Sequence, residues 1–115
     1  MTTAAVIVLC TAPAAGERDR LGAEDLALRL VEEGLCACVN LVPAVRSVFR
    51  WQGRVDRAEE LLLVVKTTAA AAAQLRERIV ALHPYDVPEV LEVAVTGGLP
   101  AYLQWLVDSV GPARS

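Results

Sequence analysis

Aromatic residues make up only 4% of this 115-residue chain, although 55% of its residues are hydrophobic. Valine, leucine and alanine must therefore fill most of the core, and a chain of this length is expected to form one domain over residues 1–115. No apolar run approaches the length needed to span a bilayer. The first residues, Met1-Thr2-Thr3, also lack the basic start of a secretory signal. We therefore expect a soluble, cytoplasmic protein that does not contact membranes.

The chain has no basic stripe, because its net charge is −3 and its arginines are scattered among acids. Nucleic-acid binding is therefore not expected. The three cysteines, Cys10, Cys36 and Cys38, are an odd number and lack the C-x2-C pairing of a zinc site. Alternate strand residues lie about 7 Å apart, so Cys36 and Cys38 would form a poor disulfide. Reduced thiols in a reducing compartment fit this pattern.

Common catalytic motifs are absent from the sequence. It contains no Gly-rich phosphate loop, no Ser/His/Asp set and no metalloprotease helix. The adjacent acids Glu32-Glu33 and Glu59-Glu60 are typical of solvent-exposed faces. We therefore expect neither an enzyme nor an organic cofactor.

The chain does contain clear strand patterns. Val6–Cys10 is a continuous apolar run, typical of a strand covered on both faces. Two long extended segments, Cys36–Trp51 and Arg54–Thr67, flank a tight turn at Gln52-Gly53. Pro43 cannot donate to a sheet ladder, so an edge or a bulge is expected there. These patterns predict one buried strand and a long hairpin.

Helices are predicted where apolar residues recur every three or four positions. A first stripe falls at Ala23, Leu26, Ala27, Leu30, Val31 and Gly34, and a second at Ala72, Leu75, Ile79 and Leu82. After a strand at Val90–Thr96, a last helix begins near Pro100, with the stripe Leu99, Tyr102, Leu103, Leu106, Val107 and Val110. The order βαββαβ plus a terminal helix predicts an α+β, ferredoxin-like sandwich.

The hairpin is expected to project beyond the rest of the domain. Thirteen extended residues span about 43 Å, whereas a helix of about 18 residues covers about 27 Å. Apolar residues on the projecting part and on the open sheet face then need another subunit. Oligomerisation is therefore predicted, although these lengths do not indicate three-fold symmetry.

The segment His83–Glu89 concentrates polar chemistry in a short loop. It contains the only histidine of the chain, together with Tyr85 and Asp86. Pro84 and Pro88 restrict its backbone, so the loop should hold a defined shape. An ordered loop with these side chains favours a functional role.

Lys66, the only lysine, stands near the end of an apolar strand, where a buried unpaired charge is costly. Glu89 is the expected partner, with Trp51 and Tyr85 as walls of a pocket that binds a small anion. A structural ion pair, or a lysine stem lying on the sheet with its head in water, would also explain Lys66. Interface packing would also explain Trp51.

His83 and Cys10 are candidate ligands for copper, since imidazole and thiolate both suit this metal. Cys10 closes an apolar strand, so a small core residue is the alternative interpretation. His83 alternatively caps the end of the second helix, where a positive imidazole is favoured. With one histidine per chain, a metal site would need ligands shared between subunits.

Six segments occur in the order of a known family: Val8–Pro13, Leu35–Asn40, Ser47–Gly53, Leu63–Thr68, His83–Glu89 and Tyr102–Trp105. On these segments the chain resembles the CutA family of divalent-cation tolerance proteins. The resemblance implies a ferredoxin-like homotrimer, similar in architecture to PII-type signalling proteins and linked to tolerance of copper and other divalent metals. It also implies an inter-subunit cleft lined by Trp51, Lys66, His83, Tyr85 and Glu89.

Three residues depart from the family pattern. Phe49 stands where tyrosine is frequent, Cys36 where alanine is common, and Leu82 where some members carry a first histidine before the Pro-Tyr pair. The last change weakens a copper site built on paired imidazoles. Cys10 matches the cysteine that the family offers as a copper ligand.

Two functional hypotheses follow. The first is a non-catalytic homotrimer that binds copper or another divalent cation at inter-subunit clefts, with Cys10, His83 and Glu89 as metal ligands. The second is a PII-like signalling or scaffold trimer whose cleft binds a small anionic ligand beside Lys66. An enzyme that uses Lys66 and Glu89 as acid and base is least favoured, because the sequence indicates no substrate.

Overall fold

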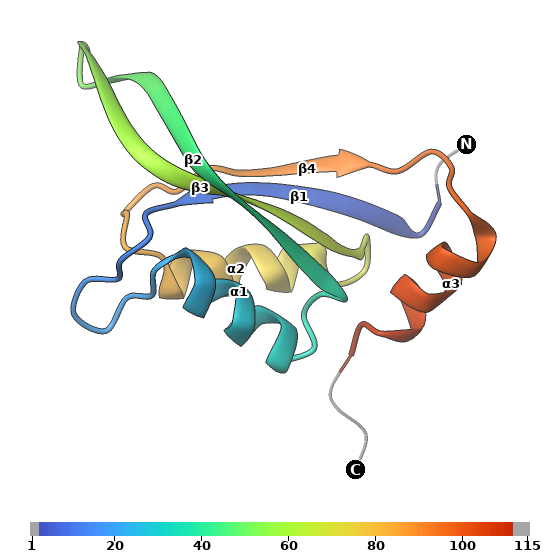
Figure 1. The fold of residues 1–115 in the computed structure, drawn as a ribbon. Helices are drawn as coiled ribbons and strands as arrows, with labels where there is room; N and C mark the ends of the chain where they lie inside the picture. Colours follow the sequence, from blue (N-terminus) through green and yellow to red (C-terminus); the bar gives the residue numbers. More distant parts are fainter. Residues whose placement is uncertain (1–2, 112–115) are drawn as a thin grey trace.

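The computed structural model describes residues 3–111, which form a four-stranded antiparallel sheet and three helices (Figure 1). In chain order these are β1 (Ala5–Ala12), α1 (Ala23–Glu32), β2 (Cys38–Trp51), β3 (Arg54–Thr68), α2 (Ala72–Leu82), β4 (Val90–Ala94) and α3 (Pro100–Asp108). The strand order is β2-β3-β1-β4. Both α1 and α2 lie on one face of the sheet, and α3 lies at the end opposite the hairpin (Figure 1). The predicted α+β, ferredoxin-like order with a terminal helix is confirmed.

The core lies between the sheet and the pair α1 and α2. Its members alternate along the strands and follow the predicted stripes of the helices: Val6, Val8, Cys10, Leu26, Leu30, Leu63, Val65, Leu75 and Ile79. The expectation that β1 is covered on both faces is wrong within one chain. Ile7 and Leu9 are only half-buried, because α1 and α2 both lie on the other face.

Two strand boundaries differ from the prediction. β2 begins at Cys38 rather than Cys36, because Cys36 is buried in the connection from α1, where the Thr67 hydroxyl donates to the Leu35 carbonyl at 2.8 Å. β4 ends at Ala94 rather than Thr96, because Ala94 is opposite Val6, near the beginning of its antiparallel partner β1. The length of an apolar run in the sequence does not show where the neighbouring strand in the sheet stops.

The long hairpin of β2 and β3 has the predicted irregularity at Pro43. The register between β2 and β3 shifts between Val42 and Val45, which leaves Pro43 and Ala44 outside the ladder. β2 is an edge strand, so the missing Pro43 donor breaks no pairing with another strand. The bulge increases the local twist and bends the hairpin away from the sheet.

The hairpin projects beyond the other strands, as expected (Figure 1). β1 pairs with β3 only from Leu61 to Thr68, so Arg54 to Glu60 pair with β2 alone. Gln52 and Gly53 form the turn with φ angles of +50° and +78°, the left-handed values of a tight hairpin turn. The projecting ribbon carries exposed apolar residues at Val48, Phe49, Trp51 and Val55.

Apolar surface also remains exposed elsewhere on the chain. On β4, Leu91 is 56% and Val93 46% exposed. Of the stripe predicted for α3, only Leu106 is buried. Tyr102 of that stripe and Trp105, which was not part of it, are both exposed, with ring centroids 5.4 Å apart. No helix within residues 3–111 is long and apolar enough to cross a membrane.

Candidate functional site

The end of α2 places the imidazole of His83 in the interior. Leu82 is the last helical residue, and the extended backbone of His83 turns the chain towards β1. The His83 side chain is fully buried, with Nε2 2.7 Å from the carbonyl oxygen of Thr11. The backbone N–H of Tyr85 donates to Nδ1 at 3.0 Å. Nδ1 therefore accepts, and Nε2 carries the proton that it donates to Thr11.

This environment keeps His83 neutral. Burial lowers its pKa below the ordinary value, and the bond to Thr11 and the charge of Glu60 only partly oppose this effect. Both ring nitrogens are occupied by backbone partners. A metal ion could bind His83 only after one of these bonds is broken.

Tyr85 connects the loop to the base of the hairpin. Its hydroxyl donates to Glu60 Oε2 at 2.9 Å, and its ring centroid lies 4.8 Å from that of His83. Burial and the bond to Glu60 raise the pKa of Tyr85 to about 12. The phenol therefore remains protonated and acts as a donor at neutral pH.

Glu60 was expected to be exposed, but it is only 5% exposed and belongs to the site. Adjacent strand residues point to opposite faces, so Glu59 and Glu60 cannot share one environment. Glu60 has the same parity as the half-buried Leu62 and Val64 of β3. That row is the less buried one, since Leu63 and Val65 of the other row are fully buried, so alternation along β3 did not mark Glu60 as a buried residue.

Cys10 lies beside this group on β1. It is fully buried, and its pKa is raised to about 12 by burial, with smaller contributions from the charges of Glu89 and Glu60. Its thiol therefore stays protonated at neutral pH. We call Cys10, Glu60, His83, Tyr85 and Glu89 the loop cluster. Three of these residues were predicted from the sequence as metal ligands.

Arg20 supports the loop cluster and was also missed. Its Nη1 donates to the carbonyl oxygens of Val80 and His83, at 3.2 and 3.1 Å. The N–H of Leu21 donates to the Leu82 carbonyl at 2.8 Å. The connection between β1 and α1 thus satisfies the last carbonyls of α2, which have no partner within the helix.

Lys66 lies apart from Glu89 within one chain. In the ladder Lys66 is opposite Ile7, whereas Glu89 precedes Val90, which is opposite Cys10. Three residue steps along β1, from Ile7 to Cys10, separate the rows of Lys66 and Val90, about 10 Å. Among residues 3–111 the ion pairs are Arg20 with Asp19 and Arg78 with Glu33, so the expected pair of Lys66 with Glu89 does not form within the chain.

Trp51 also lies away from the loop cluster. It is 51% exposed beside the hairpin turn and pairs with Arg54. Six residue steps along β3 separate Arg54 from Glu60, about 20 Å. A cleft containing Trp51, Lys66, Tyr85 and Glu89 together would therefore need more than one copy of the chain.

The residues of one chain do not fit a divalent cation as they stand. No group of three or more His, Cys, Asp or Glu side chains within the described part of the chain has the spacing to hold a metal. The Cys10 thiol is protonated and both His83 nitrogens are occupied. A cation would need ligands from another copy, a rearranged loop, or both.

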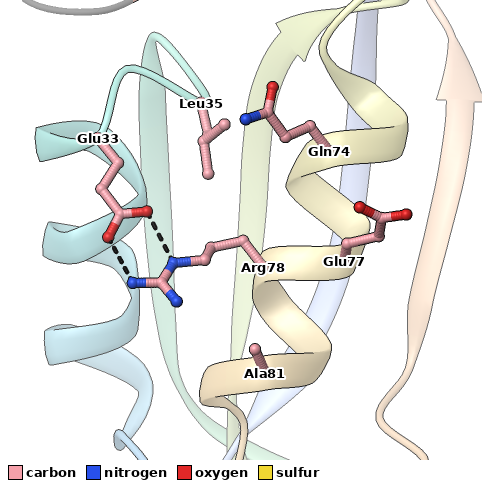
Figure 2. Close-up of a pocket in the computed structure, with 6 residues that line it drawn as sticks. All are labelled: Glu33, Leu35, Gln74, Glu77, Arg78 and Ala81. Carbon is pink, nitrogen blue, oxygen red and sulfur yellow. Dashed lines mark hydrogen bonds and ion pairs between the residues drawn. The ribbon is translucent and has the colours of Figure 1, made fainter.

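A second feature is a shallow depression between α1 and α2, lined by Glu33, Leu35, Gln74, Glu77, Arg78 and Ala81 (Figure 2). Arg78 spans it and donates two bonds of 2.7 Å to the carboxylate of Glu33. The charges of this pair neutralise each other. None of the residues predicted from the sequence as site residues lines this depression, and the Glu77 carboxylate lies in its lining outside the pair of Arg78 with Glu33.

The sequence matches the family model for the CutA1 divalent ion tolerance protein over residues 6–109. The chain is 51% identical to the divalent-cation tolerance protein CutA of Thermus thermophilus over 89 aligned residues. The aligned residues cover 77% of this chain and 86% of that protein. The solved Thermus structure superposes with a TM-score of 0.83 at 47% identity, over 93% of this chain and 99% of that one.

Two further solved structures are similar. The PII-like protein CutA from Nostoc sp. PCC 7120 has a TM-score of 0.83 and 32% identity, covering 94% and 99% of the two chains. The protein from Archaeoglobus fulgidus, described as a periplasmic divalent cation tolerance protein CutA, has a TM-score of 0.82 and 33% identity, covering 93% and 99%. The chain belongs to the CutA1 divalent ion tolerance protein family.

Proposed function

We propose that this protein serves divalent-cation tolerance as a non-catalytic homotrimer, whose inter-subunit clefts bind copper or another divalent cation. The observation that carries the proposal is the family match over residues 6–109, together with 51% identity to a Thermus protein named for divalent-cation tolerance.

Assembly is supported by apolar surface that one chain leaves uncovered. Leu91 and Val93 are exposed on β4, and Val48 and Val55 are exposed on the projecting ribbon. Contact between copies would cover these side chains and gain about 25 cal/mol for each Å² of apolar area removed from water. It would also allow Trp51 and Lys66 of one copy to approach the loop cluster of another.

Sedimentation equilibrium tests the assembly directly. We expect three copies per particle at working concentrations. A monomer would contradict the trimer and, with it, a cleft that contains both Lys66 and Glu89.

The proposed cation ligands are Cys10, His83 and Glu89. Thiolate suits Cu(I) in particular, and carboxylate suits harder divalent ions. Because the pKa of Cys10 is about 12, a metal at this thiol must displace a proton. Binding through Cys10 should therefore strengthen as the pH rises.

Equilibrium dialysis with copper under reducing conditions tests these ligands. Cys10→Ser, His83→Ala and Glu89→Gln should each bind less copper than the parent, whereas Glu77→Gln, exposed on α2, should bind as much. Circular dichroism and sedimentation would verify that each variant remains folded and assembled. Equal binding by the first three variants would show that the ligands are assigned incorrectly.

The second candidate function is a PII-like signalling or scaffold trimer whose cleft binds a small anion. It is favoured by the described surroundings of Lys66, whose Nζ contacts Cys38 Sγ at 3.8 Å and no carboxylate among residues 3–111. The Nostoc relative is itself described as PII-like. A pull-down with the parent and with Lys66→Ala tests this function: loss of a bound protein with Lys66→Ala would support it, and identical sets of bound proteins would contradict it.

We also propose a cytoplasmic location, since Cys10, Cys36 and Cys38 are all free thiols. The Archaeoglobus relative is described as periplasmic, so the periplasm is the alternative location. Cell fractionation with an antibody against the protein would decide between them.

A further inference from the structure

The connection between β1 and α1 (residues 13–22) is folded tightly on itself. The backbone N–H of Glu17 donates to the Arg20 carbonyl at 3.1 Å, and the N–H of Arg20 donates to the Glu17 carbonyl at 3.0 Å. A Cβ added at Gly16 would collide with the same Arg20 carbonyl, so the backbone approaches itself where only glycine fits. These contacts fix the position from which the Arg20 side chain extends.

Arg20 supplies the positive charge at the end of α2. The last turn of α2 contains no basic residue of its own. Arg20 Nη1 instead donates to the carbonyl oxygens of Val80 and His83, at 3.2 and 3.1 Å. A cation is stabilised at the C-terminus of a helix by the helix dipole, and a charged donor forms a stronger hydrogen bond than a neutral one. Arg20 therefore anchors the backbone of His83 more firmly than an uncharged side chain would.

The same stretch of chain holds His83 at two points. The carbonyl of Thr11, at the end of β1, accepts the proton of the imidazole Nε2 at 2.7 Å, and Arg20 binds the His83 carbonyl. In this inward conformer Nδ1 accepts from the backbone N–H of Tyr85 at 3.0 Å. The backbone and the side chain of His83 are therefore fixed together, and neither ring nitrogen offers a free lone pair to a cation.

The inward conformer opposes the ligation proposed for His83. Nδ1 becomes available only when the Tyr85 N–H leaves it, and Nε2 only when its proton and its bond to Thr11 are lost. Either change moves the loop between α2 and β4 relative to β1. A protein that binds a ligand only in a minor conformer has an apparent affinity reduced in proportion to the population of that conformer. Any residue that stabilises the inward conformer therefore weakens cation binding through His83.

We propose that Arg20 is a positioning residue that holds His83 in the inward conformer and thereby limits its ligation of a cation. Arg20 itself does not touch the cation. Its role is opposite in sign to that of a residue that only stabilises the site, because its removal increases the population of the conformer that binds. The inference rests on the proposed function for ligation by His83, whereas the holding of the loop is a property of the metal-free protein and is measured separately.

Amide hydrogen exchange of the metal-free protein, followed by NMR, tests the holding of the loop. The Tyr85 amide should exchange about fivefold faster in Arg20→Ala than in the parent, because the charged anchor of His83 is lost. Amides of the central strand β3 report global unfolding and should change less. Arg20→Lys keeps a cation at the carbonyls and should restore most of the protection. Arg18→Ala removes the same charge from the same turn and should exchange at the parent rate. Unchanged exchange in Arg20→Ala, or equal acceleration in Arg18→Ala, would overturn the proposal.

Equilibrium dialysis with copper under reducing conditions tests the consequence for ligation. Arg20→Ala should bind copper about fivefold more tightly than the parent, whereas Arg18→Ala and Arg20→Lys should bind it with the parent affinity. Equal or weaker binding by Arg20→Ala would overturn the proposal. Absence of copper binding in the parent and in all variants would overturn ligation by His83 together with the proposed function. Faster exchange of the Tyr85 amide in Arg20→Ala would, in that case, still support the holding of the loop by Arg20.

Discussion

The hydroxyl of Tyr85 donates a 2.9 Å hydrogen bond to Oε2 of Glu60, a carboxylate that is only 5% exposed. This bond joins the loop between α2 and β4 to the point where the hairpin leaves the sheet. The loop and the base of the hairpin, which both contribute to the proposed cleft, are therefore held together by this hydrogen bond within one chain. Displacement of the loop would leave the Glu60 carboxylate without this donor.

Tyr85→Phe removes that donor. We expect the free energy of unfolding to fall by about 1 kcal/mol, because a buried acceptor loses its hydrogen bond. Urea denaturation would measure the loss. Tyr102→Phe, exposed on α3, is the matched control and should change stability by less than about 0.5 kcal/mol. Equal values for the two variants would show that the Glu60 bond contributes nothing to stability.

The same bond predicts an effect at high pH. The pKa of Tyr85 is about 12 in the folded protein, above the ordinary 10.0. Its contribution to stability is therefore complete below about pH 10 and is lost as the pH rises towards 12. In a spectrophotometric titration of phenolate, the parent should show a late step that Tyr85→Phe lacks. A Tyr85 step at the ordinary value would contradict the assigned bond.

His83 predicts the opposite dependence at mildly acidic pH. Its folded pKa lies below the ordinary 6.5, because burial disfavours the imidazolium. Below about pH 6.5 the unfolded chain binds the proton first, so the free energy of unfolding falls as the pH drops towards the folded pKa. His83→Gln should lose less stability than the parent between about pH 7 and pH 5. Since the chain has one histidine, its NMR titration is unambiguous, and a pKa at or above 6.5 would refute the prediction.

The bidentate pair of Arg78 with Glu33 predicts a local titration effect. The hydrogen bonds from Arg78 lower the pKa of the Glu33 carboxyl below 4.5, with a smaller contribution from the charge of Arg29. The pair therefore supports folding above that value and loses this effect as the pH falls through the lowered pKa. Carbon-detected NMR should show the Glu33 pKa rising in Arg78→Gln and staying unchanged in Arg76→Gln. An unchanged Glu33 titration in Arg78→Gln would contradict the pair.

The hairpin turn predicts a purely conformational cost. A Cβ added at Gly53 would meet no atom within 4 Å, but the φ of +78° is unfavourable for alanine. Gly53→Ala should therefore reduce the free energy of unfolding by about 1 kcal/mol. Gly97, whose added Cβ also meets nothing and whose φ is not in the positive range, is the matched control. Gly97→Ala should be neutral or slightly stabilising, and an equal loss at both glycines would contradict the turn geometry.

The helices and strands were predictable because burial within one chain leaves a periodic pattern in the sequence. Leu26 and Leu30 of α1, and Leu75 and Ile79 of α2, recur at helical spacing and are all fully buried. Pro43 was predictable for a different reason, since its missing donor must lie at an edge or a bulge. Local patterns of this kind are sufficient to predict the helices, the strands and the bulge.

The candidate site was less predictable, because it depends on strand register. The sequence placed Lys66 with Glu89, but the pairing of β1 with β3 and β4 puts them in different rows of the sheet. Neither the buried position of Glu60 nor the contact of Lys66 with Cys38 is visible before that register is known. The stripe of α3 was visible in the sequence, but periodicity does not say whether another element of the chain covers it.

Within one chain, the ribbon beyond Glu60 carries exposed side chains, and its strands pair only with each other. Substitutions at Val48 or Val55 would therefore alter the folding of a solitary chain very little, because these side chains make few contacts that folding creates. Any strong evolutionary or mutational sensitivity at this ribbon must originate in another molecule. The residues of the projecting ribbon therefore contribute to association with other molecules rather than to the folding of the single chain.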